Sequence, residues 1–143
     1  MPTDVEVYEA LALRIEVDRD GTCKYFNSAG ELHRDNGPAV EYKSGSRAWF
    51  QNGKLHRTDG PAVVWSDGDE EWYQNGLRHR VGGPAIETAH GSKHWVRNGK
   101  PHREDGPAVI NPDGRKVWWI DGVEYSEQEY HTALKTQGRK HDK

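Results

Sequence analysis

The sequence is short of cysteine, of apolar residues and of net charge, and each shortage argues against a class of protein. The single cysteine, Cys23, excludes an internal disulfide and is typical of a reducing compartment. Apolar residues make up 33% of the 143 residues, so a conventional globular core would be thin and only one domain is expected. The formal net charge of −3 provides no basic field that would hold nucleic acid.

Long apolar runs are also missing. No stretch approaches the ~20 apolar residues that a membrane-spanning helix needs. The first residues, MPTDVEVYEALALR, are acidic where a signal peptide needs a basic region. We therefore expect a cytoplasmic protein without a membrane span.

What the chain has instead is a repeat with a period of 23 residues. The unit His-Arg-x-x-Gly-Pro-Ala begins at His33, His56, His79 and His102. Tryptophans recur in the same register, at Trp49, Trp72, Trp95 and Trp118, as do Asn-Gly or Asp-Gly pairs at residues 52–53, 75–76, 98–99 and 121–122. A fixed period of this length indicates a repeat architecture, in which each unit buries its apolar face by stacking on its neighbours.

One unit, residues 60–82, reads as a series of short strands. Residues 62–65 and 70–74 are rich in β-branched and aromatic residues, with turn residues 66–69 between them. Asn75-Gly76 predicts a type I′ hairpin turn, followed by a third extended piece at 77–80. The predicted fold class is therefore all-β: an elongated antiparallel β-meander or solenoid of about four repeats.

The two ends depart from the repeat. Residues 1–14 form a lead-in, in which 5–13 fit a strand or a short helix equally well, and the repeat domain covers 15–125. The distance from Gly21 to Gly30 predicts one residue inserted between Gly21 and Phe26. Ser126 and Glu129 form a capping box, which predicts a C-terminal helix over 126–137 that covers the last strand, followed by a basic tail at 138–143.

These residues resemble the MORN repeats, a family of 23-residue β-hairpin units. The stretches that carry the resemblance are residues 49–56 (WFQNGKLH) and 95–102 (WVRNGKPH), together with the Asp-Gly turns at 67–68 and 113–114. The arginine after each histidine and the Gly-Pro-Ala that follows depart from the family pattern. They look more like a variant found in phage and large-virus proteins. The resemblance implies a β-repeat scaffold for protein–protein interaction, located in the host cytoplasm if a phage encodes it.

The repeated polar residues favour structural roles. Histidines in adjacent units would lie ~10–14 Å apart, too far to share a metal ion, so we expect no metal site and no cofactor. The arginines precede acids in two loops, which predicts local ion pairs that hold each loop. The third loop is the exception, because Arg80 is followed by Val81-Gly82. Arg80, with Arg78 nearby, is the candidate ligand-binding pair.

The repeated tryptophans are expected to form the stacked core, so the better binding candidates are aromatics that break the repeat. Trp65 has Tyr42, Thr88 and Asn111 as its counterparts, and Trp119 has Phe50, Tyr73 and Val96. Adjacent Trp118 and Trp119 face opposite sides of a strand, which predicts that one of them is exposed. Trp65, Tyr73 and Trp119 are therefore the candidate protein-binding residues.

Two functional hypotheses follow. The first is a non-enzymatic scaffold that binds another protein, extended by the resemblance to a phage or viral factor that inhibits a host defence protein. The second is a scaffold for a small ligand or nucleotide that uses repeat arginines and tryptophans. No unique catalytic set is found, which argues against an enzyme. Open sheet ends and surface aromatics also permit self-association.

Overall fold

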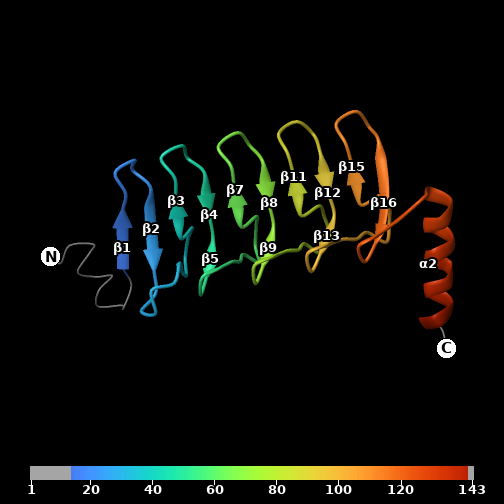
Figure 1. Ribbon diagram of the computed structural model, residues 1–143, viewed down its shortest axis with the longest axis horizontal. Helices are drawn as coiled ribbons and strands as arrows, with labels where there is room; N and C mark the ends of the chain where they lie inside the picture. The colour runs from blue at the N-terminus through green and yellow to red at the C-terminus, as the bar shows by residue number, and fades with distance from the viewer. Residues whose placement is uncertain (1–13, 142–143) are drawn as a thin grey trace. The chain divides into compact units, whose positions relative to one another are not determined.

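The computed structural model describes residues 14–141, so the two alternatives for residues 5–13 lie outside the described residues. The described chain consists of short antiparallel strands followed by one helix, α2, which confirms the predicted all-β meander with a terminal helix (Figure 1). It divides into two compact units, the first ending at Leu77 and the second beginning at Arg78. No helix within the described range is long and apolar enough to cross a membrane.

The main sheet of the first unit is a meander of six strands, each antiparallel to the next. They are β1 (Arg14–Val17), β2 (Cys23–Phe26), β3 (Val40–Glu41), β4 (Arg47–Ala48), β7 (Val63–Val64) and β8 (Glu70–Glu71). Two smaller sheets accompany it: β5 (Phe50–Gln51) pairs with β6 (Lys54–Leu55), and β9 (Tyr73–Gln74) with β10 (Leu77–Arg78). Strand β10 contains the sequence boundary between the units.

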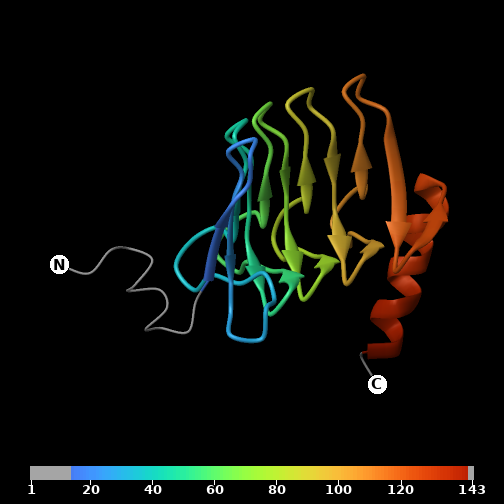
Figure 2. The same cartoon turned by 60° about the vertical axis from the view of Figure 1, so that its left-hand side comes forward.

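The second unit repeats this plan. Its main strands are β11 (Ile86–Glu87), β12 (Lys93–His94), β15 (Val109–Ile110), β16 (Lys116–Ile120) and β17 (Val123–Tyr125). The small hairpin consists of β13 (Val96–Arg97) and β14 (Lys100–Pro101). Helix α2 (Glu127–His141) packs against β16 and β17. Figure 2 shows the small hairpins turned away from the direction of the main strands.

The return strand predicted over residues 70–74 is broken at Trp72 into β8 and β9. The equivalent residue Trp49 shows why. Its N–H donates to the carbonyl of Ala62 at 2.7 Å, and its carbonyl accepts from the N–H of His56 at 3.0 Å. Trp49 is therefore the position at which the chain leaves the main sheet for the small one. The last return strand, β16, continues through Trp118 without a break.

The turns adopt the predicted conformations. Asn75 and Gly76 have φ angles of 50° and 81°, as a type I′ turn requires, and the other three pairs match them. In the turn before each return strand, glycine supplies the positive φ, for example 101° at Gly68. The inserted residue was placed wrongly: β2 keeps the repeat register through Phe26, and the extra residue lies in the turn at 27–31. A turn tolerates an added residue because it interrupts no strand pairing.

The core is thin and consists largely of small residues. The four alanines of the Gly-Pro-Ala units, Ala39, Ala62, Ala85 and Ala108, are each 0% exposed. In the first unit, Val40, Ala48 and Val63 form a buried cluster on one sheet face, and the apolar side chains of the small hairpins pack against it. The small hairpins thus cover part of the main sheet, which lets a chain with few apolar residues form a core.

Helix α2 begins with the predicted capping box. The Ser126 N–H donates to Glu129 Oε1 at 3.0 Å, and the Glu129 N–H donates to Ser126 Oγ at 3.2 Å. The Ser126 backbone N–H and, after it, the Ser126 hydroxyl lower the pKa of the Glu129 carboxyl below its usual value. The helix continues to His141, four residues beyond the predicted end at residue 137. The first part of the expected tail, residues 138–141, is therefore helical.

Candidate functional site

Each histidine of the repeated motif holds the next hairpin turn. The Nδ1 atom of His56 accepts the backbone N–H of Asn75 at 3.0 Å. The same bond, 2.9–3.0 Å long, joins the other three histidines to the turns 19 residues ahead. An accepting Nδ1 requires the neutral tautomer with the proton on Nε2, and in His33 that nitrogen lies 2.8 Å from Asp35 Oδ1. The prediction of structural histidines is confirmed.

Each arginine of the motif folds back over its own loop. The guanidinium of Arg57 lies 3.9 Å above the ring of Trp49, donates from Nη1 to the Pro61 carbonyl at 3.1 Å and pairs with Asp59. Arg103 makes the same contacts with Trp95, Pro107 and Asp105. The predicted structural role of these arginines is confirmed.

The glycine of the motif makes room for this arginine. A Cβ atom added at Gly60 would lie 2.7 Å from Cζ of Arg57, closer than real Cβ contacts come. The tryptophans were expected in a stacked core, but they are half-buried, and guanidinium groups cover Trp49 and Trp95.

The structure corrects the expectation of a free arginine in the third loop. Arg80 Nη1 donates to the Pro84 carbonyl at 3.0 Å and lies 3.6 Å from Glu87 Oε1. The acid comes from strand β11 instead of the loop, and for this reason the loop sequence did not reveal it. Arg78 lies in β10. Burial of His94 and, as the smaller cause, the charge of Arg78 lower the pKa of His94. Whether Arg78 and Arg80 bind a ligand stays a prediction.

Two of the three candidate protein-binding residues come together. Trp65 Nε1 donates to Glu71 Oε2 at 2.8 Å, and the Tyr73 hydroxyl donates to Glu71 Oε1 at 3.2 Å. The Trp65 side chain is 43% exposed, whereas Tyr73 is half-buried against the core cluster. Glu71 is a residue that the sequence analysis missed, since an acid on a strand resembles any solvated position.

The third candidate, Trp119, belongs to the second unit. It lies in β16 opposite Glu124 and is half-buried. Its neighbour Trp118 packs on α2, with ring centroids 4.8 Å from Tyr130 and 5.5 Å from His131. Trp118 is half-buried as well, so the expectation that one of the two is exposed was wrong. Whether Trp119 contacts a partner stays a prediction.

Neither Trp118 nor Trp119 is exposed, but the first unit has an exposed pair of aromatic residues, Tyr42 and Trp65. Tyr42 is 41% exposed and occupies the repeat position of Trp65. Val40 pairs with Ala48, and Ala48 with Val63, so these three residues share one sheet face. Tyr42 follows Val40 by two residues and Trp65 follows Val63 by two, which places both rings on that face. We call these two residues the Tyr42–Trp65 surface.

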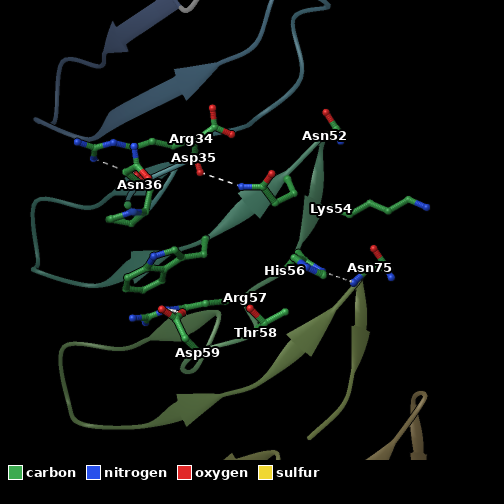
Figure 3. A pocket seen from close by; sticks show the side chains of 14 residues that line it. Arg34, Asp35, Asn36, Asn52, Lys54, His56, Arg57, Thr58, Asp59 and Asn75 are labelled. Carbon is green, nitrogen blue, oxygen red and sulfur yellow. Dashed lines mark hydrogen bonds and ion pairs between the residues drawn. The ribbon is translucent and has the colours of Figure 1, made fainter.

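The first unit also contains a polar groove of about 1040 Å³. Figure 3 shows the arginine-bearing loops with Arg34 and Arg57 on one side, and Lys54 with the Asn52 and Asn75 turns on the other. Like Arg57, Arg34 makes a cation–π contact and an ion pair: its guanidinium lies 3.9 Å over the Tyr25 ring and pairs with Glu41 at 2.9 Å. None of the five candidate residues from the sequence lines this groove.

No known protein family model matches the chain, and no curated protein matches it. The resemblance to MORN repeats therefore rests on the motif residues themselves. Within residues 14–141, no group of three or more histidine, cysteine or acidic side chains is placed to hold a metal ion.

Proposed function

We propose that this chain is a non-enzymatic scaffold that binds another protein through the Tyr42–Trp65 surface. The observation that carries the proposal is the exposure of both rings, 41% and 43%, at one repeat position on one sheet face. Tyrosine and tryptophan are the side chains that most often dominate the binding energy of protein interfaces. A pair of them on a rigid sheet offers a large contact area with little entropy to lose.

The local structure prepares the surface for binding. The hydrogen bond from Trp65 Nε1 to Glu71 orients the indole before any partner arrives. Ser46 is 4% exposed; its carbonyl accepts the N–H of Tyr42 at 2.9 Å, and its hydroxyl accepts the N–H of Ser66, the residue after Trp65, at 2.9 Å. The second unit has Thr88 and Asn111 at the equivalent positions. A residue that serves the scaffold should recur in every unit, whereas a contact residue need not.

The partner is best sought first among host proteins, since the motif resembles repeats of phage and viral proteins. A cytoplasmic setting is part of the proposal, supported by the single cysteine. Inhibition of a host defence protein is the most specific form of the proposal, and it requires the partner to be identified.

The test is affinity capture from host lysate with the tagged chain and two variants. In the first variant, Tyr42→Ala and Trp65→Ala are combined; in the matched control, Asn111→Ala changes the same repeat position in the second unit. We expect a stoichiometric protein that the wild type and the control retain and the double variant loses. Capture of the same protein by all three chains, each folded by circular dichroism, would exclude this surface.

The groove supports a second candidate function, the binding of a small anion or nucleotide. Three cationic side chains, Arg34, Lys54 and Arg57, line it together with the carboxylates of Asp35 and Asp59. Lys54 packs on Gly76, and Lys100 packs in the same way on Gly122 in the second unit. Lys100→Met is therefore a matched control for Lys54→Met.

The corresponding measurement is thermal unfolding with inorganic phosphate and with ATP. A ligand at about 100 times its Kd stabilises a protein by ~2.7 kcal/mol, which is readily seen as a rise in Tm. We expect the rise in the wild type and in Lys100→Met and its loss in Lys54→Met. No rise with either anion would count against the groove as an anion site.

A further inference from the structure

We infer that the groove of the first unit binds a carboxylate group, which accepts a hydrogen bond from Nε2 of His56. This inference rests on the second candidate function proposed above, anion binding in the groove, and specifies the chemical class of the anion. Three observations support it: an unused donor on His56, the carboxylates that bond to the equivalent nitrogen in two other repeats, and the charge of the groove.

The Nε2 atom of His56 is a donor without an acceptor. Nδ1 of the same ring accepts the N–H of Asn75 at 3.0 Å, which requires that the ring proton lies on Nε2. Within residues 14–141, no hydrogen bond or ion pair engages this nitrogen. Every buried side-chain nitrogen or oxygen in the same range has a partner, so Nε2 of His56 is accessible to solvent. The bond to the Asn75 turn therefore fixes the ring with a donor open to a ligand.

Two other repeats show which group this nitrogen binds. In the first repeat, Nε2 of His33 lies 2.8 Å from Oδ1 of Asp35. In the fourth repeat, Nε2 of His102 lies 3.1 Å from Oε1 of Glu104. Each acid comes two residues after its histidine. In both repeats the acceptor is thus a carboxylate oxygen.

The second and third repeats lack this acid. Thr58 and Val81 occupy the equivalent positions. Of the two histidines concerned, His56 lines the groove of about 1040 Å³, and Thr58 lines it as well. A ligand in the groove therefore meets the nitrogen that the chain's own acid covers in the first and fourth repeats.

The charge of the groove suits an anion with one negative charge. The cation Arg34 pairs with Glu41 at 2.9 Å. Arg57 pairs with Asp59 at 3.1 Å. The third cation of the lining, Lys54, makes no ion pair within the described range. A carboxylate carries one negative charge, whereas a phosphate group carries about 1.5 to 2, so one ammonium balances a carboxylate more fully.

This ammonium belongs to the side of the groove where His56 makes its contact. Lys54 precedes His56 by two residues, and Figure 3 shows Lys54 on the same side as the Asn75 turn that His56 contacts. The other acid of the lining, Asp35, is bonded to His33 of its own repeat. The groove thus offers a carboxylate one fixed donor and one ammonium.

The experiment titrates carboxylates into the full chain and follows the imidazole nitrogens of His56 by NMR. The probes are sodium acetate, a blocked peptide with one glutamate between glycines, and the same peptide with glutamine. Sodium chloride keeps the ionic strength matched at constant pH. His56→Asn identifies the His56 signals by their loss, and the asparagine oxygen still offers the Asn75 N–H an acceptor while no donor replaces Nε2.

We expect acetate and the glutamate peptide to shift the Nε2 signal of His56, and the glutamine peptide and chloride to leave it in place. In His56→Asn, binding of the glutamate peptide, followed at the Asn75 amide, should weaken about tenfold, because a hydrogen bond to a charged group is lost. Tighter binding of the peptide than of acetate would identify a protein side chain as the source of the carboxylate. Equal affinity would identify a free carboxylic acid.

Two further variants test the position of the carboxylate. Thr58→Asp places an acid two residues after His56, as in the first repeat, and should abolish binding by supplying Nε2 with its own acceptor. Asn36→Asp adds the same charge to the same groove at a position where the second and fourth repeats have aspartate. It should weaken binding no more than about threefold.

Three results would overturn the inference: equal loss of binding in Thr58→Asp and Asn36→Asp, equal shifts with the glutamine peptide, or a His56 signal that no carboxylate moves. The outcome is separable from that of the proposed functions. If phosphate raises the Tm through Lys54 and no carboxylate moves the His56 signal, the groove binds anions and the carboxylate is wrong. If carboxylates move the signal and neither phosphate nor ATP raises the Tm, the carboxylate is supported and the nucleotide is wrong. Neither result depends on the Tyr42–Trp65 surface, since neither ring lines the groove.

Discussion

Replacement of Tyr130 should show how much stability the second unit gains from its helix. Tyr130 is 1% exposed, and its ring packs on Trp118 where the earlier repeats place a guanidinium over the equivalent tryptophan. Its hydroxyl donates to the Arg103 carbonyl at 2.6 Å and accepts the Gly106 N–H at 3.3 Å. Tyr130 thus supplies, from α2, the contact that the next repeat would have made.

Two substitutions distinguish the stability that the Tyr130 ring contributes from the stability that its hydroxyl contributes. Tyr130→Phe leaves the Arg103 carbonyl and the Gly106 N–H without their partner, which should cost about 1–3 kcal/mol. We expect the lower part of that range, because Arg103 and Gly106 are half-buried and water can replace part of the bond. Tyr130→Ala also removes a buried aromatic ring and should cost about 3–5 kcal/mol.

Urea unfolding followed by the helical circular dichroism signal measures both losses. Lys135→Ala, an exposed position on the same helix, is the control for helix propensity. The reasoning is refuted if Tyr130→Phe is as stable as Lys135→Ala and Tyr130→Ala loses less than about 1 kcal/mol. That result would mean that α2 lies on the sheet without stabilising it.

Three further predictions concern the repeat itself. Gly60→Ala should destabilise the first unit by about 0.5–2 kcal/mol in urea unfolding, because the new Cβ displaces the Arg57 guanidinium from the Trp49 ring and from the Pro61 carbonyl. The loss should shrink in an Arg57→Ala background, and an additive double-mutant cycle would contradict the contact. His56→Phe removes the acceptor of a turn N–H and should cost about 0.5–1.5 kcal/mol; unchanged urea stability would contradict this. Burial and the charge of Arg78 lower the pKa of His94, so folding favours its neutral form. The contribution of His94 to folding stability should be complete above its ordinary pKa of 6.5. It should be lost as the pH falls through the lower pKa that His94 has in the folded protein. His94→Gln should flatten the acid side of the stability–pH curve, and an unchanged curve would contradict the assignment.

Much of the fold could be predicted from the sequence because the determinants are local and repeated four times. A type I′ turn requires positive φ at two consecutive residues, which asparagine and glycine adopt most easily, and Asn75 and Gly76 have positive φ in the structure. The capping box at Ser126 is equally local, since its partners are three residues apart. The break of a return strand at its tryptophan could not be predicted, because at Trp49 it depends on hydrogen bonds to Ala62 and His56, which lie further along the chain.

The candidate site was harder to predict because its members are assembled across strands. Trp65 was found as a departure from the repeat, but Glu71, which orients it, is visible only once β7 and β8 are paired. Arg80 was expected to be free because its loop lacks an acid, yet Glu87 reaches it from β11. The groove of the first unit joins two loops and two turns that lie 23 residues apart in the chain.

The sequence by itself determined the period, the turn types, the strand-rich fold class and the capped terminal helix. These depend on backbone preferences of single residues and on spacings of a few positions. Only the tertiary structure decided what each motif residue contacts: the histidine holds the next turn, the arginine covers a tryptophan, and the glycine leaves room for it. Such contacts depend on which side chains the stacking of successive units brings within a few ångströms, and no local preference encodes that distance.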